Sequence, residues 1–145
     1  MVFRILRWLI ALFVAIQLVP FGREHSNPPV IREPPWDSPQ TRALARRACY
    51  NCHSHETAWP WYSLIAPASW LATNHVTEGR KHLNFSEWNK PQRHANDIEE
   101  QIHMGEMPPS SYLLFHPEAK LTAAEQEALI DGFAKMLGYE AKATQ

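Results

Sequence analysis

The chain has 145 residues, with 14 basic and 15 acidic side chains, 12 prolines and 2 cysteines. This length predicts one domain with appendages rather than two independent cores. Because the charges nearly cancel and form no Lys/Arg block or acidic tail, the composition argues against a nucleic-acid-binding protein. Once the apolar N-terminus and the proline-rich stretch after it are set aside, roughly 100 residues remain for the domain. A domain of this size is only marginally stable by itself, so a large buried cofactor would help its core.

Residues 1–21 have the layout of an export signal or a signal anchor, because Arg4 and Arg7 precede an apolar run from Trp8 to Val19. The run is shorter than the ~20 residues of a comfortable membrane span, yet no small-residue cleavage site follows it. We expect residues 5–21 to be an uncleaved transmembrane anchor, with a cleaved signal or a buried soluble helix as alternatives. The positive-inside rule then predicts a single-pass protein of the bacterial inner membrane, with its domain in the periplasm.

Residues 22–38 are rich in proline and polar side chains. Proline removes backbone donors and favours an extended polyproline conformation of ~3.1 Å per residue. We expect this linker to be a tether that holds the domain away from the membrane. The alternative is a strap packed on the domain and anchored by Val30, Ile31 and Trp36.

The folded domain is expected over residues 39–138 and should be all-α, because the sequence has no convincing period-two strand pattern. Ser38 followed by Pro39 is typical of an N-cap and a first-turn proline. These residues predict a helix that reaches Ala48 and leads directly into Cys49.

Three further helices are predicted from proline starts, apolar spacing and capping residues. They lie between Pro67 and Gly79, between Ala95 and Ile102, and between Thr122 and Gly138. The last is the clearest, since Thr122 and Glu125 form a capping box and Gly138 supplies a C-terminal stop.

Two segments are expected to lie outside regular structure. Residues 112–115 could form a short strand, but Pro108, Pro109 and Pro117 surround them and favour an extended loop. Residues 139–145 are expected to be a C-terminal tail.

Cys49, Cys52 and His53 form a C-x-x-C-H motif at the end of the first domain helix. In haem attachment of this type, two thiols form thioethers with the haem vinyl groups and the imidazole binds iron. A short helical turn can bring both sulfurs to one porphyrin edge while holding His53 beneath the iron. We therefore expect one covalent haem c per chain.

Three other sites could use the same cysteines. A redox-active dithiol usually lies between a strand and a helix, which this pattern does not supply. A zinc site could add His53 or His55, but structural zinc typically draws on a second, distant ligand pair. A disulfide would close too small a loop to stabilise the fold much.

Met107 is the predicted second axial ligand of the iron. It precedes a proline on a loop after a helix, where missing amide donors and fixed dihedral angles can hold a thioether towards iron. The alternative is a methionine that only fills a gap in the core. His103 and Met104 are the next candidates for the ligand.

Other aromatic and histidine residues have weaker assignments. The aromatic residues after the motif could wall a porphyrin: Trp59, Trp61, Tyr62 and Trp70. Residues 84–88 are expected to form a helical turn with Phe85 and Trp88 on one side. The remaining histidines are expected on the surface: His25, His55, His75, His82, His94 and His116.

Three segments together carry a family resemblance. They are Cys-Tyr-Asn-Cys-His-Ser-His-Glu-Thr-Ala-Trp-Pro-Trp-Tyr-Ser at 49–63, Asn-Phe-Ser-Glu-Trp at 84–88 and Gly-Glu-Met-Pro-Pro at 105–109. In these segments the chain resembles the bacterial family of haem-binding domain proteins, over residues 36–137. The resemblance implies a single c-type haem domain behind an N-terminal membrane segment, with both cysteines and His53 as attachment residues.

These observations predict a small cytochrome c-like electron carrier rather than an enzyme, working with a redox partner protein at the membrane. A Met107 ligand would close the iron's open position and favour outer-sphere electron transfer. An open position would instead favour a small peroxidase or a gas or redox sensor. A structural subunit stabilised by haem is a further alternative.

Overall fold

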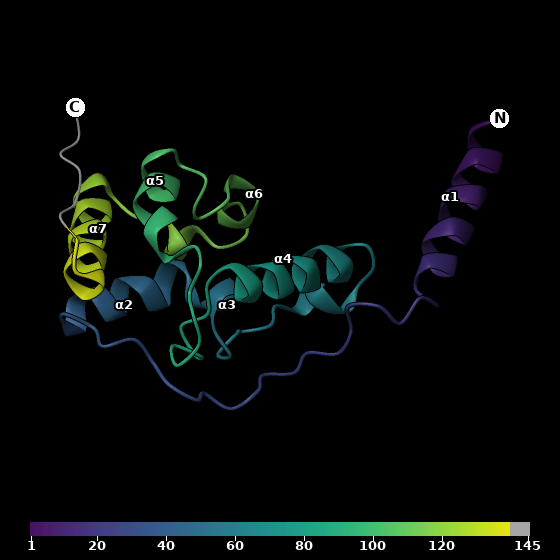
Figure 1. Ribbon diagram of the computed structural model, residues 1–145. Helices are drawn as coiled ribbons and strands as arrows, with labels where there is room; N and C mark the ends of the chain where they lie inside the picture. Colours follow the sequence, from purple (N-terminus) through teal and green to yellow (C-terminus); the bar gives the residue numbers. More distant parts are fainter. Residues whose placement is uncertain (140–145) are drawn as a thin grey trace.

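The structure, a computed structural model, describes residues 1–139 and is built from helices, as expected. Figure 1 shows the helices of the domain gathered together, with the first helix standing apart. The helices are α1 (Val2–Ile16), α2 (Pro39–Ala48), α3 (Tyr50–His53), α4 (Ala68–His82), α5 (Ile98–His103), α6 (Ser110–Leu113) and α7 (Ala123–Leu137). Short 3-10 turns lie at Trp61–Leu64, Ala95–Asp97 and Pro117–Ala119. Residues 1–139 contain no β-strand, and the expected tail lies outside the described residues beyond Tyr139.

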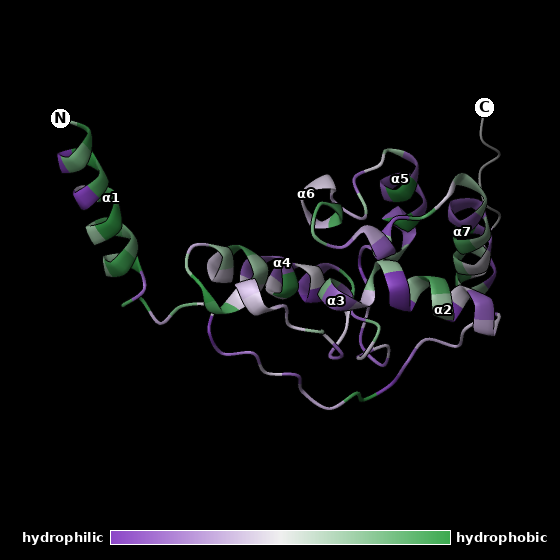
Figure 2. Ribbon diagram, turned by 180° about the vertical axis from the view of Figure 1, so that it is seen from behind, coloured by the Kyte–Doolittle hydropathy of each residue, from purple (hydrophilic) through white to green (hydrophobic). Residues whose placement is uncertain are grey.

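The predicted transmembrane anchor is wrong. α1 has 15 residues, and Gln17 is its C-cap. At 1.5 Å per residue the helix is only about 22 Å long, which is shorter than the ~30 Å hydrocarbon core. None of the helices within residues 1–139 combines the length and the apolar character needed to cross a membrane. This finding contradicts the prediction of a single-pass inner-membrane protein with a periplasmic domain. Figure 2 shows that α1 is nevertheless largely apolar, and none of its residues is buried.

The start of α2 confirms the expected cap. Ser38 has an extended backbone conformation, and its hydroxyl accepts a hydrogen bond from the Thr41 N–H at 3.1 Å. Pro39 occupies the first helical turn, where its missing N–H costs nothing. Cys49 ends α2 and also caps α3, so the cysteine motif is a continuation of this helix.

The other helices agree with their sequence signals in most respects. α4 follows Pro67, and α7 has the reciprocal capping box of Thr122 and Glu125. Gly138 ends α7 in the left-handed conformation, with φ 76°. The third predicted helix is divided into the Ala95–Asp97 turn and α5.

Two local predictions are wrong. Ser110–Leu113 is the short helix α6 rather than an extended loop, because Pro109 precedes the helix and does not interrupt it. Residues 84–88 form a non-helical turn. The Asn84 side-chain oxygen accepts from the Ser86 N–H at 2.9 Å and thereby replaces a helical hydrogen bond. Phe85 and Trp88 still lie on one side, as predicted, with stacked rings 6.1 Å apart.

Phe85 lies at the centre of the core and is fully buried. Its ring lies 5.5 Å from those of Trp36 and Tyr50 and 5.9 Å from that of Phe133. Leu129 and Phe133 bring α7 into the same cluster. Segments that are distant in the sequence therefore meet at one aromatic residue.

Residues 22–38 run along the domain and form a strap, which is the second of the two arrangements expected from the sequence (Figure 1). The N–H groups of Ile31 and Arg32 donate to the Ser86 carbonyl at 2.9 and 3.1 Å. The Trp88 N–H donates back to the Arg32 carbonyl at 2.9 Å. Of the three expected anchors, only Trp36 packs against the core, while Val30 and Ile31 are exposed.

His55 joins the strap to the domain and is buried, contrary to the prediction of a surface position. Its Nδ1 donates to the Pro29 carbonyl at 2.8 Å, and its Nε2 accepts from the Asn84 amide at 3.1 Å. Both ring nitrogens are therefore satisfied inside the protein, as a buried polar side chain requires.

The α2–α7 contact depends on a glycine. A Cβ atom added at Gly132 would overlap the Thr41 side chain, whose hydroxyl lies 2.9 Å from that of Ser38. Gly132 therefore lets α7 approach the first turn of α2 closely.

We predict that Gly132→Ala destabilises the protein by about 1–3 kcal/mol, because overpacking outweighs the better helix propensity of alanine. Chemical denaturation measures the change in free energy of unfolding. The matched control is Asp131→Ala, an exposed position on the same helix, which should change stability by less than ~0.5 kcal/mol. A Gly132→Ala variant as stable as the parent would contradict the close contact.

Candidate functional site

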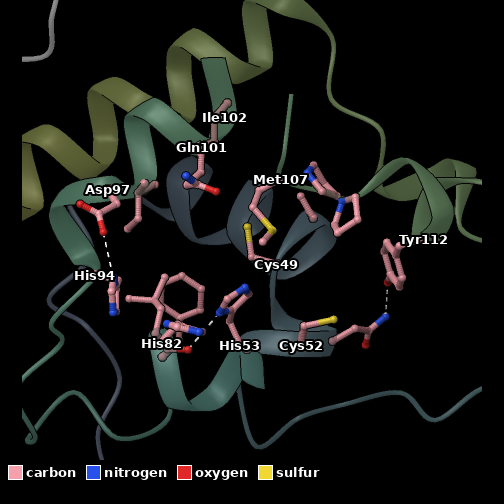
Figure 3. A pocket seen from close by; sticks show the side chains of 18 of the residues that line it. Cys49, Cys52, His53, His82, His94, Asp97, Gln101, Ile102, Met107 and Tyr112 are labelled. Carbon is pink, nitrogen blue, oxygen red and sulfur yellow. Dashed lines mark hydrogen bonds and ion pairs between the residues drawn. The ribbon is translucent and has the colours of Figure 1, made fainter. Parts of the chain in front are cut away.

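A cavity of about 510 Å³ lies beside the cysteine motif and is lined by segments of α2 to α5, the loop before α6, and α7 (Figure 3). Its walls are mainly apolar, and the buried side chains among them are Ala48, Leu83, Phe85, Ile98, Ile102, Leu121, Leu129 and Phe133. A cavity of this size and character can enclose a large apolar ligand, provided that a few polar groups orient it.

Cys49 and Cys52 line this cavity and have free thiols. Burial raises the pKa of Cys49 to about 12, and the neighbouring Cys52 adds to the shift. Burial also raises the pKa of Cys52 to about 11, against the opposing influence of Arg80. A redox dithiol needs a stabilised thiolate, so this environment does not favour that alternative.

His53 lies on the same turn and lines the same cavity. Its Nδ1 donates to the Leu83 carbonyl at 3.0 Å, which leaves Nε2 with a free lone pair. Burial is the main cause that lowers the pKa of His53, so the ring is held neutral. A neutral imidazole whose other nitrogen is bonded to a carbonyl is the usual form of a metal-binding histidine.

Gly79 allows α4 to lie directly against the cysteine turn. A Cβ atom at this position would lie 2.5 Å from the Cys52 carbonyl oxygen and 3.1 Å from the Cys52 Cβ. Any other residue would push the turn and α4 apart. The sequence marked Gly79 only as a helix end, whereas the structure places it inside α4.

Asn51, between the two cysteines, fixes the turn from its other side. Its side-chain amide donates to the Tyr112 hydroxyl at 2.6 Å, and its side-chain oxygen accepts from the Ala58 N–H at 2.9 Å. Burial raises the pKa of Tyr112 to about 12, so its hydroxyl stays protonated. The sequence does not reveal this role of Tyr112, because Tyr112 is 61 residues away from Asn51 and no local pattern connects the two.

Met107 is the one of the three predicted second ligands that lines the cavity. Figure 3 shows its sulfur in the region above His53 and beside Cys49. Its N–H donates to the Gln101 carbonyl at 3.1 Å, which holds the loop against α5. Met104 is 64% exposed, and His103 lies 4.0 Å from Glu99, so both are directed elsewhere.

The predicted aromatic walls do not belong to this cavity. Trp59, Trp61 and Tyr62 line a second cavity of about 390 Å³. Trp70 lines neither of the two cavities. Three histidines also line the first cavity: His75, His82 and His94. His82 and His94 are exposed, as predicted, whereas His75 is half-buried. A zinc site is not supported, since the described part of the chain has no group of three or more His, Cys, Asp or Glu side chains placed to hold a metal.

The comparisons with known proteins give one informative result. A family model described as a haem-binding domain matches residues 11–135. No curated protein and no solved structure matches the chain. The match includes the cavity residues discussed above.

We predict that both thiols of the folded chain are slow to alkylate. Only the thiolate reacts, and pKa values raised to about 11 and 12 lower its fraction near neutral pH by roughly 100-fold or more. Reaction with iodoacetamide should accelerate steadily between pH 8 and pH 10, and mass spectrometry of quenched samples measures it. The denatured chain is the control, and equal rates in the two states would contradict the buried environment of the cysteines.

Proposed function

The chain belongs to the family of haem-binding domain proteins, and we propose that it is a c-type cytochrome that carries electrons with one covalent haem. The observation that carries the proposal is the placement of Cys49, Cys52 and His53 on one turn that faces a mainly apolar cavity. When bound, haem supplies one-electron iron chemistry, which amino-acid side chains do not provide.

The donor set of the cavity suits this cofactor. Each cysteine thiol would add across one haem vinyl group, so that a sulfur–carbon bond would form and the thiol proton would move to the neighbouring carbon. Cys49 and Cys52 both line the cavity, and they lie within one helical turn of each other. Two thioethers would fix the cofactor in one orientation.

His53 would bind the iron through Nε2. The Leu83 carbonyl holds the ring through Nδ1 at 3.0 Å, fixes the tautomer and makes Nε2 more basic. Burial lowers the pKa of His53, which favours the neutral ring with Nε2 free of a competing proton. These contacts orient the ligand before the cofactor arrives.

Met107 would supply the second protein ligand to the iron. The cavity places it with His53 among its lining residues, and the Gln101 carbonyl anchors its backbone. A thioether ligand closes the iron to small molecules and favours the reduced state. These properties suit an electron carrier that exchanges electrons with a redox partner protein.

We predict that haem is attached covalently. The chain made together with c-type maturation factors should retain haem on a denaturing gel, because two thioethers survive unfolding. Cys49→Ala and Cys52→Ala should each weaken attachment, and the double variant should lose it.

Haem staining of the gel and intact mass measure the attachment. The matched control is Asn74→Ala on the exposed face of α4, which should leave attachment unchanged. If the unsubstituted chain carries no haem under these conditions, the proposal is overturned.

Met107→Ala should remove the sulfur-to-iron charge-transfer band of the ferric protein, lower its reduction potential and increase its affinity for carbon monoxide. Optical spectra and a redox titration measure these changes. Met104→Ala, at an exposed position on the same loop, is the control. If the parent already binds carbon monoxide rapidly, Met107 is not a strong ligand, and a small peroxidase or sensor would fit better.

A further inference from the structure

A polar cluster lies at the end of the first cavity that is distant from Cys52. It consists of His82 at the end of α4, His94 just before the Ala95–Asp97 turn, and Asp97. Figure 3 shows this cluster and Cys52 on opposite sides of His53. The cavity is therefore polar at the end away from Cys52.

The two histidines form one unit. Their ring centroids lie 4.7 Å apart, with the rings at 74° to one another. His94 Nδ1 lies 2.8 Å from the Asp97 carboxylate and donates to it. Asp97 thereby holds the His94 ring in position, and the imidazolium form of His94 offers its Nε2–H as a free donor.

The cluster has donor capacity to spare. Within residues 1–139, neither ring nitrogen of His82 has a hydrogen-bond partner. The acidic side chains of this cavity already have partners, since Glu78 pairs with Lys81 at 2.6 Å and Asp97 pairs with His94. Both histidines are solvent-exposed at the rim, where a charged ligand group can enter without full loss of water.

Haem has a matching asymmetry. Its two vinyl groups and its two carboxylate side chains occupy opposite halves of the porphyrin. If Cys49 and Cys52 hold the vinyl half, the carboxylates point towards the other end of the cavity. Carboxylates in a mainly apolar cavity require hydrogen-bond donors.

We propose that His82 and His94 form the binding site for the haem carboxylates, with Asp97 as a positioning residue for His94. This inference rests on the proposed function, because the carboxylates reach the cluster only if haem occupies the cavity. The cysteines would fix one end of the cofactor, and the histidines would select a ligand with anionic groups at the other end.

The test compares two probes, ferric haem and its dimethyl ester, which has the same ring without the negative charges. Both are titrated at one pH into the full chain carrying Cys49→Ala and Cys52→Ala, so that binding is reversible. This double cysteine variant, the reference chain of the titration, should bind haem roughly tenfold or more tightly than the ester, as expected for charge-assisted hydrogen bonds. Adding His82→Leu and His94→Leu should bring the ratio of affinities close to one.

Two variants sharpen the comparison. His75 also lines the cavity, but it belongs to the second cavity together with Cys52, so it lies towards the attachment end. His75→Leu should leave the ratio unchanged. His82→Gln retains an amide donor and should preserve part of the preference for haem.

The outcomes separate the two proposals. Two results would overturn the carboxylate site while haem binding stands. One is equal binding of both probes by the reference chain, and the other is a ratio of affinities that His82→Leu and His94→Leu leave unchanged. Failure of this chain to bind either probe would also overturn the carboxylate site, whereas the proposed function is overturned only if the unsubstituted chain carries no covalent haem. In the covalently loaded protein, His82→Leu should also lower the reduction potential, because less hydrogen bonding leaves more negative charge near the iron.

Discussion

The contact between the cysteine turn and α4 is the constraint on which the rest of the site depends. Gly79 lets the two helices approach until the Cys52 carbonyl lies where a side chain would otherwise be. The same approach brings Leu83, at the end of α4, within hydrogen-bond distance of His53. One close helix contact therefore sets both the position of the sulfurs and the orientation of the imidazole.

The cavity is asymmetric because different elements build its two ends. α3 supplies Cys52 at one end, where Asn51 and Tyr112 hold the turn. The end of α4 and the segment before α5 supply His82 and His94 at the other. Such an arrangement can bind a ligand with distinct ends in a single orientation, which a uniformly apolar cavity cannot do.

The strap and the core are mechanically linked. Residues 22–38 pair with the turn that contains Ser86, and the next residue to Ser86, Phe85, occupies the centre of the core. His55, two residues after His53, bonds to the strap at Pro29. The proline-rich segment is therefore hydrogen-bonded to the domain close to the core and to His53, and it does not act only as a spacer.

The sequence by itself determined the features that depend on neighbouring residues: the Ser38 cap of α2, the capping box of α7 and the motif that joins both cysteines to His53. Local hydrogen bonds and backbone preferences decide such features, so short patterns reveal them. The length of α1, the burial of His55 and the membership of His82 in the cavity were decided by the tertiary structure. They depend on where a helix ends and on which distant segments meet, because burial and cavity walls arise only when residues far apart in the chain pack together.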